Sequence, residues 1–114
     1  MRAAKAVVGN AFDMTARPAL TDVEKTTVIE ILHAHLPAET HVHVFGSRAT
    51  GQFKPWSDLD LAIEAPAPLS LSTLASLAEA FDESSLPWKV DLVDRRTVNE
   101  EFGRLIDLHK VSLE

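Results

Sequence analysis

The stretch Phe45-Gly46-Ser47 is followed, after ten further residues, by Asp58-Leu59-Asp60, and this spacing decides the fold. Residues two apart on a strand point to the same face, so the two acids lie roughly 6.6–6.8 Å apart along the backbone. A third acidic segment, Val90-Asp91-Leu92-Val93-Asp94, comes about thirty residues later. Carboxylates gathered from such strands suit Mg²⁺, and a Gly-Ser turn offers N–H groups and a hydroxyl to a phosphate. The pattern therefore indicates nucleotide chemistry.

Hydrophobic periodicity predicts six elements in the order α-β-β-α-β-α. In chain order, they are a helix over 22–36, strands over 41–45 and 58–63, a helix from Ser70 or Ser72 to about 84, a strand over 88–94 and a helix over 98–110. Thr21 and Glu24 form a capping box for the first helix, which Pro37 ends, and Thr97 and Glu100 form another for the last. The spacing leaves the direction of each strand open.

Three of these helices carry apolar stripes that we expect to face the core, and for the helix over 22–36 the stripe consists of Val23, Val28, Ile31, Leu32 and Leu36. For the helix that begins after Ser70 or Ser72, the expected buried residues are Leu71, Leu74, Ala75, Ala78 and Phe81. For the terminal helix, the stripe consists of Phe102, Leu105, Ile106 and His109. Residues 1–20 have weak periodicity and are predicted to be an N-terminal arm, with one domain over 21–114.

Composition narrows the function classes. The 114 residues carry a net charge of −6, which argues against a nonspecific grip on nucleic acid. The absence of cysteine excludes disulfides and thiolate metal sites. No apolar run reaches the ~20 residues of a membrane span, so we expect a soluble, cytoplasmic protein. The chain is short for an enzyme with a large acceptor, so a partner or an oligomer is expected.

The motif Gly46-Ser47, ten residues, Asp58-Leu59-Asp60 resembles the signature of the DNA-polymerase-β-like nucleotidyltransferase superfamily. The runs 45–51 and 86–92 resemble in particular the minimal nucleotidyltransferases, short catalytic subunits commonly encoded beside an all-helical HEPN-type partner. The resemblance covers residues 22–110. It implies an α/β (α+β) nucleotidyltransferase fold, in which a short mixed sheet has helices packed on one side and catalytic acids on the open side.

The resemblance also implies a role for each motif residue. Asp58, Asp60 and Asp91 would be the catalytic residues and would hold two Mg²⁺ ions, with Asp91 helping to deprotonate the acceptor hydroxyl. Three such carboxylates repel one another, which raises their proton affinity until metal binds. The nucleotide-binding residues would be Gly46, Ser47 and Arg48, because all three would contact the triphosphate.

The resemblance implies a function, the transfer of AMP from Mg-ATP to a tyrosine of a HEPN-type toxin. This function would make the chain an antitoxin. Two alternatives stay open: a non-catalytic subunit that masks its partner, and transfer to a small molecule presented by a partner. The position of the third acid is a question of strand parity, because Asp91 and Asp94 face opposite ways. The motif favours Asp91, and Asp94 is expected to cap the strand end or to pair with Arg95 or Arg96.

Overall fold

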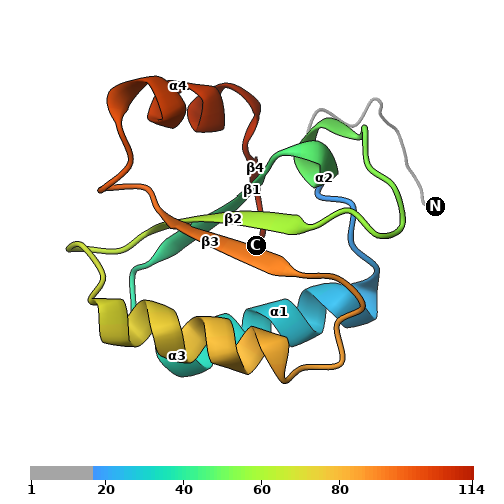
Figure 1. Ribbon diagram of the computed structural model, residues 1–114, viewed down its shortest axis with the longest axis horizontal. Helices are drawn as coiled ribbons and strands as arrows, with labels where there is room; N and C mark the ends of the chain where they lie inside the picture. Colours follow the sequence, from blue (N-terminus) through green and yellow to red (C-terminus); the bar gives the residue numbers. More distant parts are fainter. Residues whose placement is uncertain (1–16) are drawn as a thin grey trace.

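The computed structural model describes residues 17–114, which form one four-stranded sheet and four helices (Figure 1). In chain order, the elements are α1 (Asp22–His35), β1 (His41–Phe45), α2 (Ser47–Thr50), β2 (Leu59–Glu64), α3 (Leu71–Asp82), β3 (Val90–Asp94), α4 (Glu100–His109) and β4 (Val111–Ser112). The six predicted elements are all present, within about two residues at most ends. Two short elements, α2 and β4, complete the fold.

The strands lie in the order β3-β2-β1-β4. Strand β1 runs antiparallel to both β2 and β4, whereas β2 and β3 are parallel. The parallel pair is possible because α3 carries the chain back along the sheet between these two strands. The sheet is therefore mixed, which settles the strand directions that the spacing had left open. In this arrangement β2, which begins at Leu59, is a central strand.

Helices α1 and α3 cover one face of the sheet as expected, but α4 lies on the opposite side (Figure 1), so the prediction that the helices pack on one side alone does not hold for α4. The core lies between the first two helices and the sheet. The largest fully buried side chains of the described residues come from β1, β2, α1 and α3, from Leu113 near the C-terminus, and from Ile106 of α4, which lies outside this core on the other side of the sheet. They are Val28, Val44, Leu59, Leu61, Ile63, Leu77, Ile106 and Leu113. The sheet face beneath α4 is only partly covered, and this is the face on which the site lies.

Helix caps agree with the sequence at two starts and differ at the third. The capping box of α1 is formed by Thr21 and Glu24, and Ser70 caps α3. The N-cap of α4 is Asn99, whose side chain accepts from the N–H of Phe102. The prediction that Thr97 caps this helix was wrong. Its N–H and hydroxyl both donate to the carbonyl of Asp94, so Thr97 closes a turn after β3 instead.

The three predicted apolar stripes differ from the buried sides of the helices. In α1, Val28 and Leu32 are buried as predicted, but Val23 is 77% exposed. In α3, Leu71 is 85% exposed and Ala75 is also exposed, whereas Phe81 is buried as predicted and Leu77, which the predicted stripe omitted, is fully buried. In α4, Ile106 is buried and Leu105 is 57% exposed. Most of the predicted N-terminal arm lies outside the described residues. None of the helices in residues 17–114 has the length and apolar character that a membrane crossing requires.

Candidate active site

Two of the three predicted aspartates face each other across the parallel strands. Asp60 of β2 and Asp91 of β3 are register partners, so their side chains leave the sheet on the same face, about 4.8 Å apart at the backbone. Both are half-buried. Lys89, two residues before Asp91, lies on the same face and its ammonium is 3.6 Å from the Asp91 carboxylate. The parity argument that selected Asp91 agrees with this geometry.

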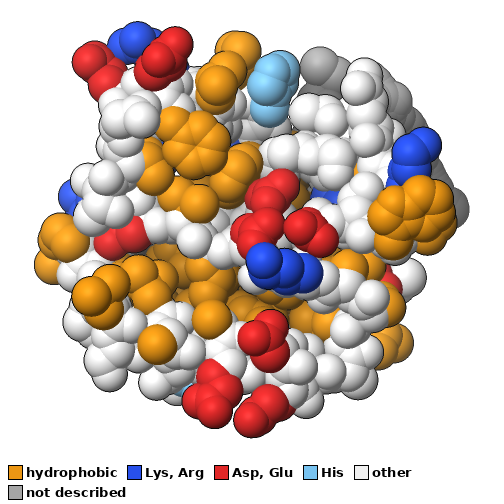
Figure 2. Space-filling view, in the orientation of Figure 1, with side chains coloured by type: hydrophobic (Ala, Val, Ile, Leu, Met, Phe, Trp, Pro, Cys, Tyr) orange, Lys and Arg blue, Asp and Glu red, His pale blue; other side chains and the backbone are white. Residues whose placement is uncertain are grey.

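Asp58 lies just before β2 and is exposed. Its charge acts on the carboxyl of Asp60. Burial, followed by the negative charges of Asp91 and Asp58, raises the pKa of Asp60 to about 6. The direction is the one expected for a carboxylate cluster without a cation. Figure 2 shows that acidic side chains gather near the centre of one face of the molecule, beside a basic side chain.

Gly46 makes room for Asp60. It joins β1 to α2 with a φ of 74°, a backbone conformation that L residues other than glycine rarely adopt. A Cβ atom at this position would collide with the Oδ2 atom of Asp60. Glycine is therefore required both by the turn and by the carboxylate packed against it. The carbonyl of Gly46 accepts from the N–H groups of Ala49 and Thr50, which starts α2.

Ser47 is the first residue of α2 and is half-buried. The first N–H groups of a helix have no partner within the helix, so this end of α2 presents donors beside the carboxylates. Strand β1 brings the turn there, because Phe45, the residue before Gly46, is the register partner of Asp60. The structure therefore brings Gly46 and Ser47 together with the aspartates, as the sequence motif predicts.

Arg48 is placed differently from the expectation. Its side chain is 4% exposed and donates to the backbone carbonyls of Ala19 and Ser57, at 2.8 and 3.0 Å. It also donates to the carbonyls of the 54–55 segment. Its guanidinium stacks over the rings of Trp88 and Phe53, 4.6 and 5.2 Å from their centroids. Direct contact with a triphosphate does not fit this geometry, because the guanidinium holds the 53–57 loop and the segment before α1 instead.

Asp94 takes the structural role expected for it. It is 6% exposed, and its carboxylate accepts from the backbone N–H groups of Leu69 and Arg96, at 2.8 and 3.0 Å. These bonds tie the end of β3 to the loop before α3. The pairing is with the backbone of Arg96, while the side chain of Arg95 pairs with Asp107 on α4. Asp94 is therefore a buried hydrogen-bond acceptor, separate from the site.

The donor set fits a hard divalent cation, but the oxygens are not yet assembled around one. Among residues 17–114, no group of three or more His, Cys, Asp or Glu side chains is already arranged as a metal site. The carboxylates of Asp58, Asp60 and Asp91 supply oxygen ligands, which Mg²⁺ prefers. The raised pKa of Asp60 reflects negative charge that a cation would neutralise. Metal binding would require side-chain rotations that bring these oxygens together.

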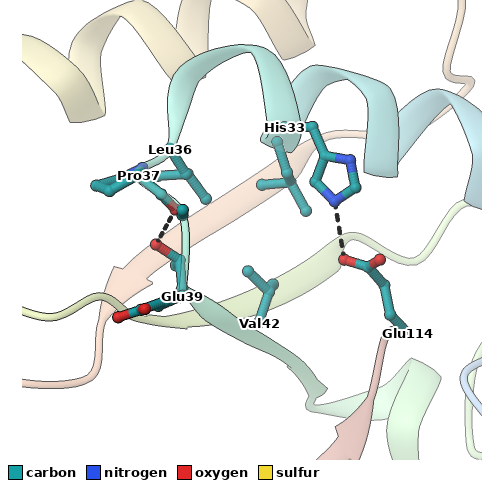
Figure 3. Close-up of a pocket in the computed structure, with 9 residues that line it drawn as sticks. His33, Leu36, Pro37, Glu39, Val42 and Glu114 are labelled. Carbon is teal, nitrogen blue, oxygen red and sulfur yellow. Dashed lines mark hydrogen bonds and ion pairs between the residues drawn. The ribbon is translucent and has the colours of Figure 1, made fainter.

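The histidines on β1 belong to a different environment from the aspartates. Burial, together with nearby Lys110, lowers the pKa of His43. A pocket of about 310 Å³ also lies away from the aspartates, between the end of α1 and the C-terminal segment (Figure 3). His33 and Glu114 both line this pocket, and the Nε2 atom of His33 lies 3.1 Å from the Oε1 atom of Glu114. None of the predicted site residues lines this pocket, so its position assigns it no part in the aspartate chemistry.

Comparison with known families decides between the classes of protein that use such a site. A family model described as "Nucleotidyltransferase domain" matches residues 25–114. This chain belongs to the nucleotidyltransferase family. The match covers every strand and helix except the start of α1, and the predicted fold class and enzyme class are confirmed.

Similar proteins agree with this assignment. The nucleotidyltransferase is 42% identical over 83 residues to "Probable protein adenylyltransferase MntA" of Haemophilus influenzae, a match that covers 73% of each chain. It superposes with a TM-score of 0.67 and 27% identity on a chain from a crystal structure of a toxin-antitoxin with AMP-PNP, over 79% of this chain and 72% of that one.

A third similarity supports the fold alone. The nucleotidyltransferase matches a chain from a structure of a tri-AMPylated HEPN toxin of Shewanella oneidensis in complex with an MNT antitoxin. The TM-score is 0.62 at 23% identity, over 79% of this chain and 68% of that one. The family resemblance inferred from the motif is thus confirmed by sequence and by structure.

Proposed function

We propose that this nucleotidyltransferase transfers AMP from Mg-ATP to a tyrosine hydroxyl of a HEPN-type toxin and so acts as its antitoxin. The observation that carries the proposal is the pairing of Asp60 with Asp91 beside the Gly46 turn. This geometry occurs in a chain that is 42% identical to a probable protein adenylyltransferase. A similar chain in a toxin-antitoxin structure was solved with AMP-PNP, which supports ATP as the nucleotide donor.

Each residue has a defined part in the proposed reaction. Gly46 and Ser47 bind the triphosphate, Gly46 by allowing close approach and Ser47 through its hydroxyl. Asp58 and Asp60 would hold the donor's Mg²⁺, and Asp91 would share a second ion with them. When bound, the two ions neutralise charge on the attacking and leaving oxygens.

The acceptor oxygen attacks the α-phosphorus in line with the leaving group. An oxygen–phosphorus bond forms, the bond from the α-phosphorus to the bridging oxygen breaks, and pyrophosphate leaves with that electron pair. Asp91 takes the hydroxyl proton, because its carboxylate is part-exposed and can be reached by an acceptor. Positioning and charge stabilisation supply most of the catalysis in such a transfer.

The experiment that tests this proposal combines the chain with the HEPN protein encoded beside it, Mg²⁺ and ATP labelled on the α-phosphate. The wild type is expected to place label on the HEPN protein, and D58N/D60N to place none. Glu79→Gln, which removes one exposed charge from α3, serves as the control and should label normally. Toxin activity is measured in the same samples.

Two results would count against the proposal. A folded wild-type complex that leaves the HEPN protein unlabelled would exclude transfer to this partner. Neutralisation of the toxin that is equally strong with D58N/D60N would show that the chain acts by masking its partner. Label on a small hydroxyl compound, with none on the protein, would instead identify a small-molecule acceptor.

A further inference from the structure

Helix α4 exposes an apolar row on one flank. Phe102, Leu105 and Leu108 are spaced three residues apart and are 37%, 57% and 71% exposed. Residues at this spacing lie along one side of a helix. The inner side of α4 is formed by Gly103 and Ile106, which are buried. A surface helix of this length normally presents polar residues outside its buried side, so the exposed row is an unused contact surface.

The apolar row connects at both ends to the elements that carry the site. Phe102 makes an edge-to-face contact with Phe45, with ring centroids 5.9 Å apart, and Phe45 is the register partner of Asp60. Leu108 lines a hollow of about 630 Å³ together with Thr50 of α2, the helix that begins at Ser47. In Figure 2, hydrophobic side chains over α4 lie on the same face as the central acidic group.

The row is acidic at its N-terminal end, whereas further along α4 the charges are paired, Arg104 with Glu100 and Lys110 with Asp107. Glu100 and Glu101 occupy the first turn of α4, the predicted catalytic carboxylates lie on the same side of the sheet, and the whole chain carries a net charge of −6. A second copy would bring acid against acid, which is unfavourable across an interface. A partner with an apolar centre and a basic flank is complementary to both features of this surface.

We infer that Phe102, Leu105 and Leu108 form the docking surface for the acceptor protein, a helical partner that presents its own apolar side chains and basic residues around them. The inference rests on the proposed function and names the surface that the acceptor uses. An acceptor bound along α4 delivers its hydroxyl to the carboxylates from the side on which they are open. Residues 17–114 form one sheet with its helices and include no second domain that could hold an acceptor.

The test uses L105S/L108S, which removes exposed apolar area without touching the buried side of α4. The matched control is V23S/L71S, because Val23 and Leu71 are 77% and 85% exposed on the helices of the opposite face. Calorimetry measures the affinity of each variant for the HEPN protein encoded beside the chain and for Mg-ATP. Steady-state labelling measures kcat and KM for the HEPN protein, and circular dichroism checks the fold.

For L105S/L108S, we expect binding of the HEPN protein to weaken by about 10-fold or more, with an equal rise in KM. The values of kcat and of the Mg-ATP affinity should not change, because uniform binding is lost while the reacting groups stay in place. V23S/L71S should behave as the wild type. Unchanged HEPN affinity in L105S/L108S would overturn the inference.

A different occupant would give a different result. If the row binds a second copy, sedimentation will show a wild-type dimer that L105S/L108S separates, while HEPN affinity stays constant, and the inference fails. Failure of the proposed function is a separate observation, since it appears in the wild type as tight HEPN binding without label. In that case the affinity measurements alone still decide whether α4 is the docking surface.

Discussion

Replacing Asp60 with Asn should stabilise the metal-free protein at neutral pH. The folded state raises the pKa of this carboxyl from 3.8 to about 6 through burial and the charges of Asp91 and Asp58. The folded protein therefore binds the proton more tightly than the unfolded chain does, and the ionised carboxylate opposes folding. Full conversion of the shift gives about 3 kcal/mol at pH 8. Because Asp60 is only half-buried, solvent screening reduces this to about 1–2 kcal/mol.

The pH dependence follows from the direction of the shift. The penalty on the wild type is fully present above the folded pKa of about 6. It declines as the pH falls toward the unfolded value and is nearly absent below it. D60N should therefore be more stable than the wild type by about 1–2 kcal/mol at pH 8, as the screened shift requires, and nearly equal to it close to pH 4.

Urea unfolding followed by tryptophan fluorescence measures this difference, since Trp88 is buried in the core. The m-value should not change, because the same surface is exposed on unfolding. Glu79→Gln removes an exposed charge elsewhere and should show no such gain. Saturating Mg²⁺ should stabilise the wild type and reduce its deficit relative to D60N. A D60N protein that is less stable at pH 8, or a gain that is equal at both pH values, would refute the reasoning.

Three further predictions concern other residues of the site and its support. Gly46→Ala should abolish nucleotidyl transfer, because the added Cβ collides with the Asp60 carboxylate. Gly51→Ala is the matched control, since Gly51 also has a positive φ but lies in open space. It should cost about 1 kcal/mol of stability and leave transfer intact. Arg48→Ala should lower the free energy of unfolding by about 2–4 kcal/mol, with Arg48→Lys restoring little, while Mg-ATP affinity per folded molecule is retained. Asp94→Ala should cost about 1–3 kcal/mol in chemical unfolding by leaving two N–H groups without an acceptor, but Asp91→Asn should abolish transfer at little cost in stability.

The relative placement of the aspartates was predictable from the sequence because strand alternation constrains it. The faces of Asp60 and Asp91 follow from a period of two along each strand, and register pairing then places them opposite each other. The turn at Gly46 was predictable from the same motif. Its second function, making room for the Asp60 carboxylate, could not be predicted because it depends on how closely two strands approach.

Other features were not predictable because they depend on distant partners. Arg48 is next to Ser47 in the motif, but its carbonyl acceptors belong to the 54–57 segment and to Ala19. The α4 start at Asn99 differs from the capping box at Thr97 because Thr97 bonds back to Asp94. Strand β4 has only two residues, which are too few to show hydrophobic alternation in the sequence, so it is recognised only by its pairing with β1. In each case tertiary contacts outweigh local sequence preference.

The apolar residues of the exposed row on α4 are visible in the sequence, but periodicity alone assigns such residues to the buried side of the helix. The helix carries more apolar residues than its buried side uses, because Ile106 and Gly103 fill that side and Leu105 and Leu108 remain outside. A helix whose apolar arc is wider than the space beneath it indicates a second contact surface. Such an excess is visible only after the packing of the sheet is known.

The central claim is that Asp58, Asp60 and Asp91 converge on divalent cations beside the Gly46 turn. Anomalous diffraction from crystals grown with Mn²⁺ and AMP-PNP tests it most directly. The account predicts metal peaks within direct coordination distance, about 2 Å, of oxygens from all three aspartates, with the triphosphate against Ser47. Nucleotide bound elsewhere, or metal peaks that none of the three carboxylates contacts, would contradict it.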